Sequence, residues 1–161
     1  MVEGVKKPLV ILAGPTAVGK TRLSLMLAEK IGAEIISADS MQVYRGMDIG
    51  TAKIMPGEMQ GIRHHLIDII EPDEAFSVSV FKDLAVQKID EITGRGRIPL
   101  IVGGTGFYIQ AVLYDVDFTE HETDLEYRRE LTELYKKEGP DALYGLLLEK
   151  DPDAAEAIHK N

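Results

Sequence analysis

The sequence predicts an α/β domain with a mostly parallel sheet, followed by a region of helices alone. Up to about residue 115, short apolar runs alternate with segments whose apolar residues recur at helical spacing. Beyond that point only the helical pattern continues. We therefore expect a core domain over residues 1–118 and a helical region over residues 119–161.

The strands expected in the core are short and apolar, which is typical of strands buried on both faces. Their positions are residues 8–13, 34–38, 63–70 and 98–102. Helices are expected between and after them, over residues 20–31, 78–94 and 107–114. Gly32 ends the first of these helices and Ser77 caps the second. Residues 41–62 hold four glycines and Pro56, so we expect a functional loop with at most a short helix.

The helical region contains start signals for three helices. Asp124, the pair Gly139-Pro140 and the pair Asp151-Pro152 each mark a start, and the third helix is expected to run to Asn161. Three short acidic helices without a closing strand indicate an incomplete module. We therefore expect this chain to be a fragment of a longer protein.

Composition excludes several classes of protein. The chain has 161 residues, of which 45% are hydrophobic and none is cysteine, so disulfides, thiolate metal sites and cysteine nucleophiles are excluded. No apolar run approaches the roughly 20 residues that span a bilayer, and no signal peptide is evident. We expect a cytoplasmic protein that does not contact a membrane.

The net charge of −9 argues against binding of nucleic acid by bulk electrostatics. Residues 1–119 carry 15 acidic and 12 basic side chains, and residues 120–161 carry 12 acidic and 6 basic ones. Any contact with RNA must therefore depend on specific residues or on basic surface outside this sequence.

Residues 14–21 form a complete G-x-x-x-x-G-K-[ST] motif between a predicted strand and a predicted helix. Such a P-loop turns its backbone N–H groups and the helix N-terminus toward phosphate oxygens. Lys20 adds a positive charge, and Thr21 offers a hydroxyl to a bound Mg²⁺. The expected phosphate-binding residues are Gly14, Pro15, Thr16, Ala17, Val18, Gly19, Lys20 and Thr21. The alternative is a glycine-rich turn without a chemical role.

The motif predicts a phosphate ligand but does not define the reaction. The chain has no Asn-Lys-x-Asp or Asp-x-x-Gly motif of a GTPase, and residues 100–102 end in Gly103 instead of a Walker-B acid. A small-molecule or nucleotide kinase remains possible, as does a transferase that holds a diphosphate leaving group. A module that only binds diphosphate is a third alternative. Gly14, Asp39 and Gly103 all follow predicted strands, so we expect them at one site.

Several further motifs resemble the tRNA dimethylallyltransferase (tRNA isopentenyltransferase) family. They are SADSMQVYRGMDIGTAK at residues 37–53, HHLID at 64–68, GGTGFY at 103–108, and Asp151-Pro152 followed by Ile158-His159. The resemblance covers residues 9–161, and Phe107 is a mild departure from the family pattern. Family chains are roughly twice this length, which agrees with a fragment.

The resemblance implies a P-loop NTPase-like, nucleotide-kinase-like fold with the start of a tRNA-binding helical insertion. It implies transfer of a dimethylallyl group from dimethylallyl diphosphate to N6 of the adenosine on the 3′ side of the tRNA anticodon. Diphosphate is released, Mg²⁺ is the expected cofactor, and the family is nucleotide-binding by its P-loop. We expect the protein to be a monomer.

Three residues are expected to carry the chemistry. Asp39 would accept the proton of the attacking amine, although from spacing alone it is equally a carboxylate near the metal or a cap of the next turn. Lys20 and Thr105 would stabilise the departing diphosphate.

The residues expected to contact tRNA come from the resemblance. They are Asp39, Ser40, Met41, Gln42, Thr105 and Arg128. Gln42 carries an amide able to pair with an adenine edge, and the base must be flipped out of its stack to reach it. Without the resemblance, Arg128 would be an ordinary solvated arginine.

Other side chains have two open interpretations. Tyr44 and Tyr108 either line a channel for the prenyl group or the base, or pack in the core. Arg45 and Lys53 contact either RNA phosphates or solvent. The neighbours His64 and His65 point to opposite faces of a strand, so we expect a structural role and no zinc site.

Overall fold

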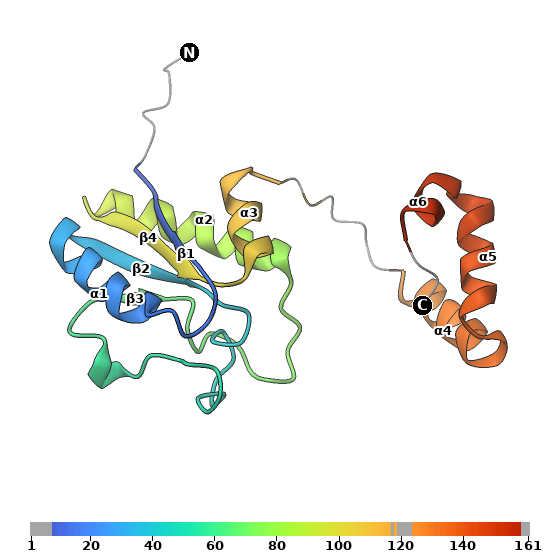
Figure 1. The fold of residues 1–161 in the computed structure, drawn as a ribbon, viewed down its shortest axis with the longest axis horizontal. Helices are drawn as coiled ribbons and strands as arrows, with labels where there is room; N and C mark the ends of the chain where they lie inside the picture. Colours follow the sequence, from blue (N-terminus) through green and yellow to red (C-terminus); the bar gives the residue numbers. More distant parts are fainter. Residues whose placement is uncertain (1–7, 117, 119–123, 159–161) are drawn as a thin grey trace, which may run out of the picture. The chain divides into compact units, whose positions relative to one another are not determined.

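The computed structural model describes residues 8–116, 118 and 124–158, and the chain divides into two compact units (Figure 1). The first unit spans Met1–Phe118, and the second spans Thr119–Asn161. The strands described all belong to the first unit, whereas the second unit is helical where it is described.

Parallel strands form the sheet of the first unit, in the order β1-β4-β2-β3. They are β1 (Val10–Ala13), β2 (Ala33–Ala38), β3 (His64–His65) and β4 (Ile98–Gly103). Ala13 and Ala38 both pair with Gly103, so β1, β4 and β2 end at the same level. This edge is where ligands bind in open parallel sheets.

Helices cover both faces of the sheet, because the strands are apolar on both faces. Helix α1 (Lys20–Ile31) packs on one face, and α2 (Val78–Gly94) and α3 (Gly106–Leu113) pack on the other. Ile35 and Ile36 are neighbours in β2 but belong to opposite faces. The predicted α/β architecture is confirmed.

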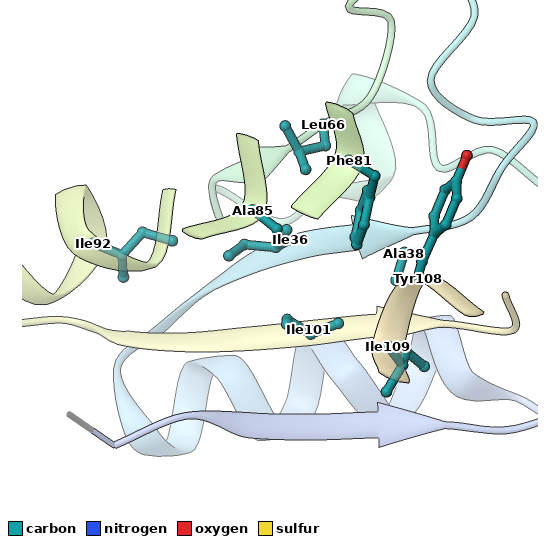
Figure 2. Packing of buried hydrophobic residues seen from close by; sticks show 9 residues of the cluster. All are labelled: Ile36, Ala38, Leu66, Phe81, Ala85, Ile92, Ile101, Tyr108 and Ile109. Atoms are coloured by element: carbon teal, nitrogen blue, oxygen red, sulfur yellow. The ribbon is translucent and has the colours of Figure 1, made fainter. Parts of the chain in front are cut away.

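The core between the sheet and helices α2 and α3 is the larger of the two apolar clusters (Figure 2). Phe81 is fully buried in it and stacks on Tyr108 with ring centroids 4.2 Å apart. Ile36 and Ile101 reach the same cluster from the two central strands. Complete burial of each such side chain contributes about 1.5–3 kcal/mol.

The helix boundaries of this unit agree with the local signals in the sequence. Gly32 ends α1 in a left-handed conformation (φ 68°), and its N–H donates to the carbonyl of Ala28. The Ser77 hydroxyl accepts a hydrogen bond from the N–H of Val80 and caps α2.

The segment between β2 and α2 departs from the prediction. The expected short helix is present as one 3₁₀ turn, η1 (Pro56–Glu58). A strand is present within the predicted residues 63–70, but the predicted extent is wrong, because β3 contains only His64–His65. Leu66 and Asp68 adopt left-handed φ values of 61° and 53°, which an extended strand cannot contain.

The second unit contains α4 (Leu125–Glu138), α5 (Pro140–Lys150) and α6 (Pro152–Ala157). The predicted starts are confirmed, since Asp124 and Asp151 accept hydrogen bonds from backbone N–H groups two or three residues into their helices. The third helix ends at Ala157 because Ile158 is extended, so the expected continuation is wrong there. Residues 159–161 lie outside the described residues.

None of the helices in the described part of the chain is long and apolar enough to cross a membrane.

Candidate active site

A pocket lies at the carboxyl ends of the strands in the first unit. The loop before α1 contributes Thr16, Gly19 and Lys20 to its lining. The end of β2 contributes Asp39, and the long loop after it contributes Thr51. Residues far apart in the sequence therefore meet at the edge where the strands end together.

The glycine-rich loop at residues 14–21 supplies one wall of this pocket. Ala17 (φ 67°) and Gly19 (φ 89°) are left-handed, which curls the loop at the start of α1. No side chain caps the first turn of α1, so its N–H groups remain available to an anion. The Lys20 ammonium donates to the carbonyl oxygen of Pro15 at 2.6 Å.

The structure separates the expected phosphate-binding residues into two groups. Five of them line the pocket: Thr16, Ala17, Gly19, Lys20 and Thr21. Gly14, Pro15 and Val18 do not belong to its described lining. The loop therefore presents Thr16, Ala17 and Gly19 to the pocket, together with the first two residues of α1.

Gly103 brings the ends of β2 and β4 into close contact. A Cβ atom at this position would lie 2.1 Å from the carbonyl oxygen of Ala38, so no larger residue fits without movement of the backbone. A Cβ atom on Gly104 would lie 3.3 Å from the carbonyl oxygen of Gly14. These glycines allow the chain at the end of β4 to lie close to the last residue of β2 and to Gly14, the first residue of the loop.

Asp39 follows the last residue of β2 and lines the same pocket as Lys20. Its Oδ1 accepts a hydrogen bond from the N–H of Met41 at 2.9 Å. This turn holds the carboxylate through Oδ1, and among the described residues no hydrogen bond to Oδ2 is present. The structure thus brings together at one pocket Asp39 and Lys20, two of the three residues expected to carry the chemistry.

Thr105 and Ser40 contact each other and lie outside the described pocket lining. The Thr105 hydroxyl accepts a hydrogen bond from the N–H of Ser40 at 3.2 Å. The Thr105 N–H donates to the carbonyl of Ala38. In this conformation Thr105 anchors the turn that carries Asp39.

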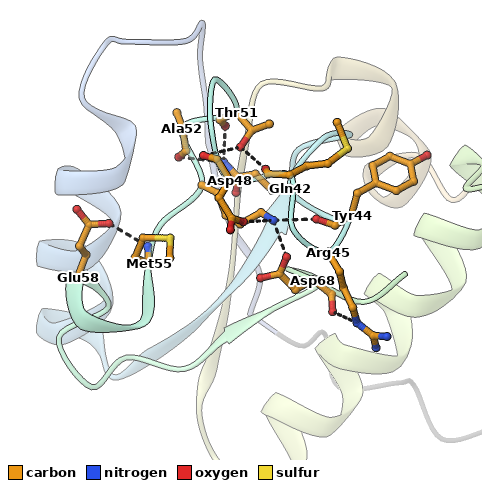
Figure 3. Close-up of polar contacts among 11 residues, drawn as sticks. Gln42, Tyr44, Arg45, Asp48, Thr51, Ala52, Met55, Glu58 and Asp68 are labelled. Atoms are coloured by element: carbon orange, nitrogen blue, oxygen red, sulfur yellow. Dashed lines mark hydrogen bonds and ion pairs between the residues drawn. The ribbon is translucent and has the colours of Figure 1, made fainter. Parts of the chain in front are cut away.

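Gln42 lines the pocket, but its amide is engaged within the protein (Figure 3). Its Nε2 donates to the carbonyl oxygens of Thr51 and Ala52 at 3.3 and 3.2 Å. Its Oε1 accepts from the hydroxyl of Ser37 at 3.0 Å. Gln42 therefore holds the loop after β2 against the end of that strand.

The sequence motifs did not reveal the apolar wall of the pocket. It consists of Ile35, Ile54, Ile67 and Val102. Ser24 also lines the pocket outside the recognised motifs, whereas Ile67, Ser37, Thr51 and His64 lie inside those motifs without having been predicted as lining residues. Position next to a motif, as for Val102 directly before Gly103, could have indicated the others.

The two histidines of β3 have different surroundings. His64 lines the pocket, and its Nδ1 lies 2.9 Å from the carbonyl of Ile62. Burial lowers the pKa of His64 despite this hydrogen bond. His65 contacts Glu34 at 2.7 Å, and Glu34 also accepts from Arg95. Within the described residues, no three His, Asp or Glu side chains could hold a metal together.

The remaining candidates have structural contacts. Tyr108 packs in the core, with its hydroxyl pointing out of the cluster in Figure 2. Burial, with the nearby Tyr44 and Asp39, raises the pKa of Tyr108, so its hydroxyl keeps its proton. The expectation that Lys53 contacts RNA or solvent is wrong, because its side chain is only 1% exposed and is paired with carboxylates. Arg45 is exposed and pairs with Glu71.

Arg128 lies in the second unit, on α4, where it is exposed. Its N–H donates to the carbonyl of Asp124 in the first turn of that helix.

A parallel sheet with a G-x-x-x-x-G-K-[ST] loop between β1 and α1 defines a P-loop NTPase-like protein. The family model for IPP transferase matches residues 42–161. The chain belongs to the IPP transferase family.

Its relatives carry a common name. A tRNA dimethylallyltransferase of Lachnoclostridium phytofermentans is 63% identical over 155 residues, which are 96% of this chain and 50% of the relative. That of Bacillus subtilis is 54% identical over 160 residues, covering 99% of this chain and 51% of the relative. The chain thus spans about half the length of the curated relatives it matches.

Solved structures agree in sequence and fold. The tRNA isopentenylpyrophosphate transferase of Bacillus halodurans is 54% identical with a TM-score of 0.71, over 97% of this chain and 52% of that one. A eukaryotic dimethylallyltransferase acting on tRNA is 36% identical with a TM-score of 0.81, over 97% of this chain and 39% of that one.

Proposed function

We propose that the protein transfers a dimethylallyl group from dimethylallyl diphosphate to N6 of the adenosine on the 3′ side of a tRNA anticodon. One observation carries this proposal: a single pocket joins an anion-binding loop, an apolar wall and the carboxylate of Asp39. An apolar wall suits a five-carbon prenyl group, and the loop suits a diphosphate. Membership in the IPP transferase family favours prenyl transfer over the kinase alternative.

The loop at residues 14–21 would stabilise the leaving group. As the bond between the prenyl carbon and the diphosphate oxygen breaks, negative charge grows on that oxygen. The N–H groups at the start of α1 and the ammonium of Lys20 would offset this charge. Lys20 uses one ammonium hydrogen for the carbonyl of Pro15, and its ammonium has two more that could reach phosphate oxygens.

Thr21 is the proposed protein ligand of Mg²⁺. Its hydroxyl belongs to the pocket lining, and the described residues there supply no cluster of carboxylates. This donor set fits Mg²⁺, which takes one or two protein oxygens and otherwise binds phosphate oxygens and water. When bound, the ion would neutralise part of the charge on the diphosphate.

Asp39 is the proposed general base. The N6 amine of adenine attacks poorly because its lone pair is delocalised into the ring. A new bond between N6 and the prenyl carbon forms as the bond to diphosphate breaks, and Asp39 would accept the N6 proton. Asp39 lies at the rim beside Met41, which leaves access for a flipped base.

The proposed contacts with tRNA surround this carboxylate. Met41 lines the pocket, whereas the backbone of Ser40 is held by Thr105. The amide hydrogens of Gln42 already donate to two carbonyl groups, so they are not free to pair with a base. Gln42 would instead support a bound base by shaping the pocket wall. Arg128 is retained as a proposed contact to tRNA from the second unit.

The test is prenyl transfer by the full-length protein, with labelled dimethylallyl diphosphate and an anticodon stem-loop RNA. Asp39→Asn keeps an oxygen that accepts from the N–H of Met41 but removes the base. We expect kcat to fall by about 100-fold or more, with binding of inorganic pyrophosphate unchanged. Equal losses of binding and turnover would instead indicate a structural or metal-related role for Asp39.

A second variant tests the loop. Lys20→Ala should weaken binding of pyrophosphate by about tenfold or more, because it removes a charge-assisted contact. Lys30→Ala is the matched control, since Lys30 lies on the same helix but outside the pocket. Phosphorylation of a small molecule without prenyl transfer would favour the kinase, and binding without any turnover would favour a module that only binds diphosphate.

A further inference from the structure

Lys53 is a buried cation in the loop that forms one wall of the pocket. Its side chain is 1% exposed, and its ammonium donates to three oxygens. Two partners are Asp48 Oδ1 and the carbonyl of Tyr44, both at 2.8 Å, and the third is Asp68 Oδ1. An ammonium has three hydrogens, so all of its hydrogen bonds are satisfied.

The partners of Lys53 come from two stretches of the chain. Tyr44 and Asp48 precede it in the same loop, whereas Asp68 lies 15 residues further on. The backbone reinforces this connection, because the N–H of Asp68 donates to the carbonyl of Gln42. Lys53 therefore closes the loop upon itself and ties it to the chain after β3.

Backbone conformation at this site also needs support. Ala52 (φ 51°) and Asp68 (φ 53°) are left-handed although neither is glycine. Such conformations are disfavoured, and they persist where the surrounding contacts over-determine them. Lys53 adjoins the first of these residues and binds the second.

Charge also stabilises the contacts of Lys53 with Asp48 and Asp68, which we call the clamp. Burial alone would lower the pKa of Lys53, but its hydrogen bonds to Asp48 and Asp68 outweigh this effect and raise the pKa above its usual value. The two carboxylates are 43% and 46% exposed, so water solvates the negative charge that the lysine does not neutralise.

The clamp is connected to the pocket through Gln42. The carbonyls of Thr51 and Ala52, directly before Lys53, accept the two amide hydrogens of Gln42. Thr51, Ala52 and Ile54 all line the pocket on either side of Lys53, which itself does not line it. Any displacement of Lys53 is therefore transmitted to this wall.

We infer that Lys53 is a positioning residue, which with Asp48 and Asp68 holds the loop at residues 42–54 in the shape that receives the prenyl group. This role rests on the proposed function, since that function assigns the apolar wall to the prenyl group. Phosphate binding by the loop before α1 does not depend on Lys53. The two halves of the pocket are thus separable by substitution.

The test compares two ligands, inorganic pyrophosphate and dimethylallyl diphosphate, by calorimetry on the full-length protein. Lys53→Met keeps the length of the side chain and removes its charge, and the exposed carboxylates remain solvated. We expect the ratio of the two Kd values to shift by about tenfold against dimethylallyl diphosphate. Amide hydrogen exchange in residues 42–54 should rise by about tenfold, with no change in α2.

Asp48→Ala is the second variant, because it removes one partner and leaves Lys53 bound to Asp68 and Tyr44. It should shift the ratio in the same direction by a smaller factor. Lys88→Met is the control, since it removes a lysine paired with Glu91 on α2, away from the pocket. Its ratio should equal that of the wild type.

Equal weakening of both ligands, or an unchanged ratio with unchanged exchange, would overturn the role of Lys53. If the wild type binds pyrophosphate but not dimethylallyl diphosphate, the proposed function is wrong. In that case the exchange data alone decide whether Lys53 holds the loop. A shifted ratio of the two Kd values, together with faster exchange confined to residues 42–54, supports both the role of Lys53 and the proposed function.

Discussion

Replacing Gly103 by alanine should destabilise the first unit by about 3 kcal/mol or more. The added Cβ would lie 2.1 Å from the carbonyl oxygen of Ala38 and 2.8 Å from its Cα. Ordinary contact needs about 3.5 Å, so the inner strands β4 and β2 would have to separate by more than 1 Å. Overpacking that displaces side chains costs about 1–3 kcal/mol, and here backbone must move.

Thermal and urea unfolding measure this effect. A domain of this size loses about 4 °C in Tm per kcal/mol, so we expect a decrease of about 10 °C or more. Gly106→Ala is the matched control, because its Cβ would meet nothing within 4 Å at the start of α3. A Gly103→Ala variant that melts within about 2 °C of this control would refute the close approach of the two strands.

Two further predictions concern stability. Burial raises the pKa of Glu34, but hydrogen bonds from Arg95 and His65 outweigh it and leave the pKa below its usual value of 4.5. Since the folded pKa is depressed, Glu34 stabilises the fold above about pH 4.5 and loses this effect as the pH falls. Glu34→Gln should therefore be less stable at neutral pH and lose less stability on acidification, as urea titrations at several pH values would reveal. Gly145→Ala, inside α5 with open space around its Cβ, should stabilise that helix by about 1 kcal/mol in thermal melts, whereas the same change at Gly139 (φ 80°) should destabilise it.

The sequence predicted the edge of the sheet that carries the pocket. The glycine-rich loop, Asp39 and Gly103 each follow an apolar run, and in a parallel sheet such positions meet. Local rules sufficed there because β1, β2 and β4 each end where their apolar run ends. The helix caps at Ser77 and Asp124 were equally local signals.

The wall opposite the loop could not be predicted, because it depends on contacts between distant residues. A lysine is normally exposed, and only its folding against Asp48 and Asp68 makes Lys53 a buried residue. Similarly, the sequence alone suggests that the Gln42 amide is free to bind a ligand. In the structure its Nε2 donates to two carbonyl oxygens, nine and ten residues away.

The prediction of a strand over residues 63–70 failed after β3 for the same reason. Its residues have strand propensity, but the hydrogen bond from the N–H of Asp68 to Gln42 and its ion pair with Lys53 bend the chain. Long-range contacts there outweigh the local preference for an extended backbone.

The opposite ends of β2 have separate tasks. Glu34, near its beginning, binds His65 and Arg95, while Asp39 follows its end, about 16 Å further along an extended chain. Protein engineers can use this separation: the charged trio is a place to install apolar replacements of similar volume, which are often neutral or favourable for heat tolerance. Such redesign would leave Asp39 and the loop at residues 14–21 unchanged, so heat tolerance can be altered separately from the proposed site.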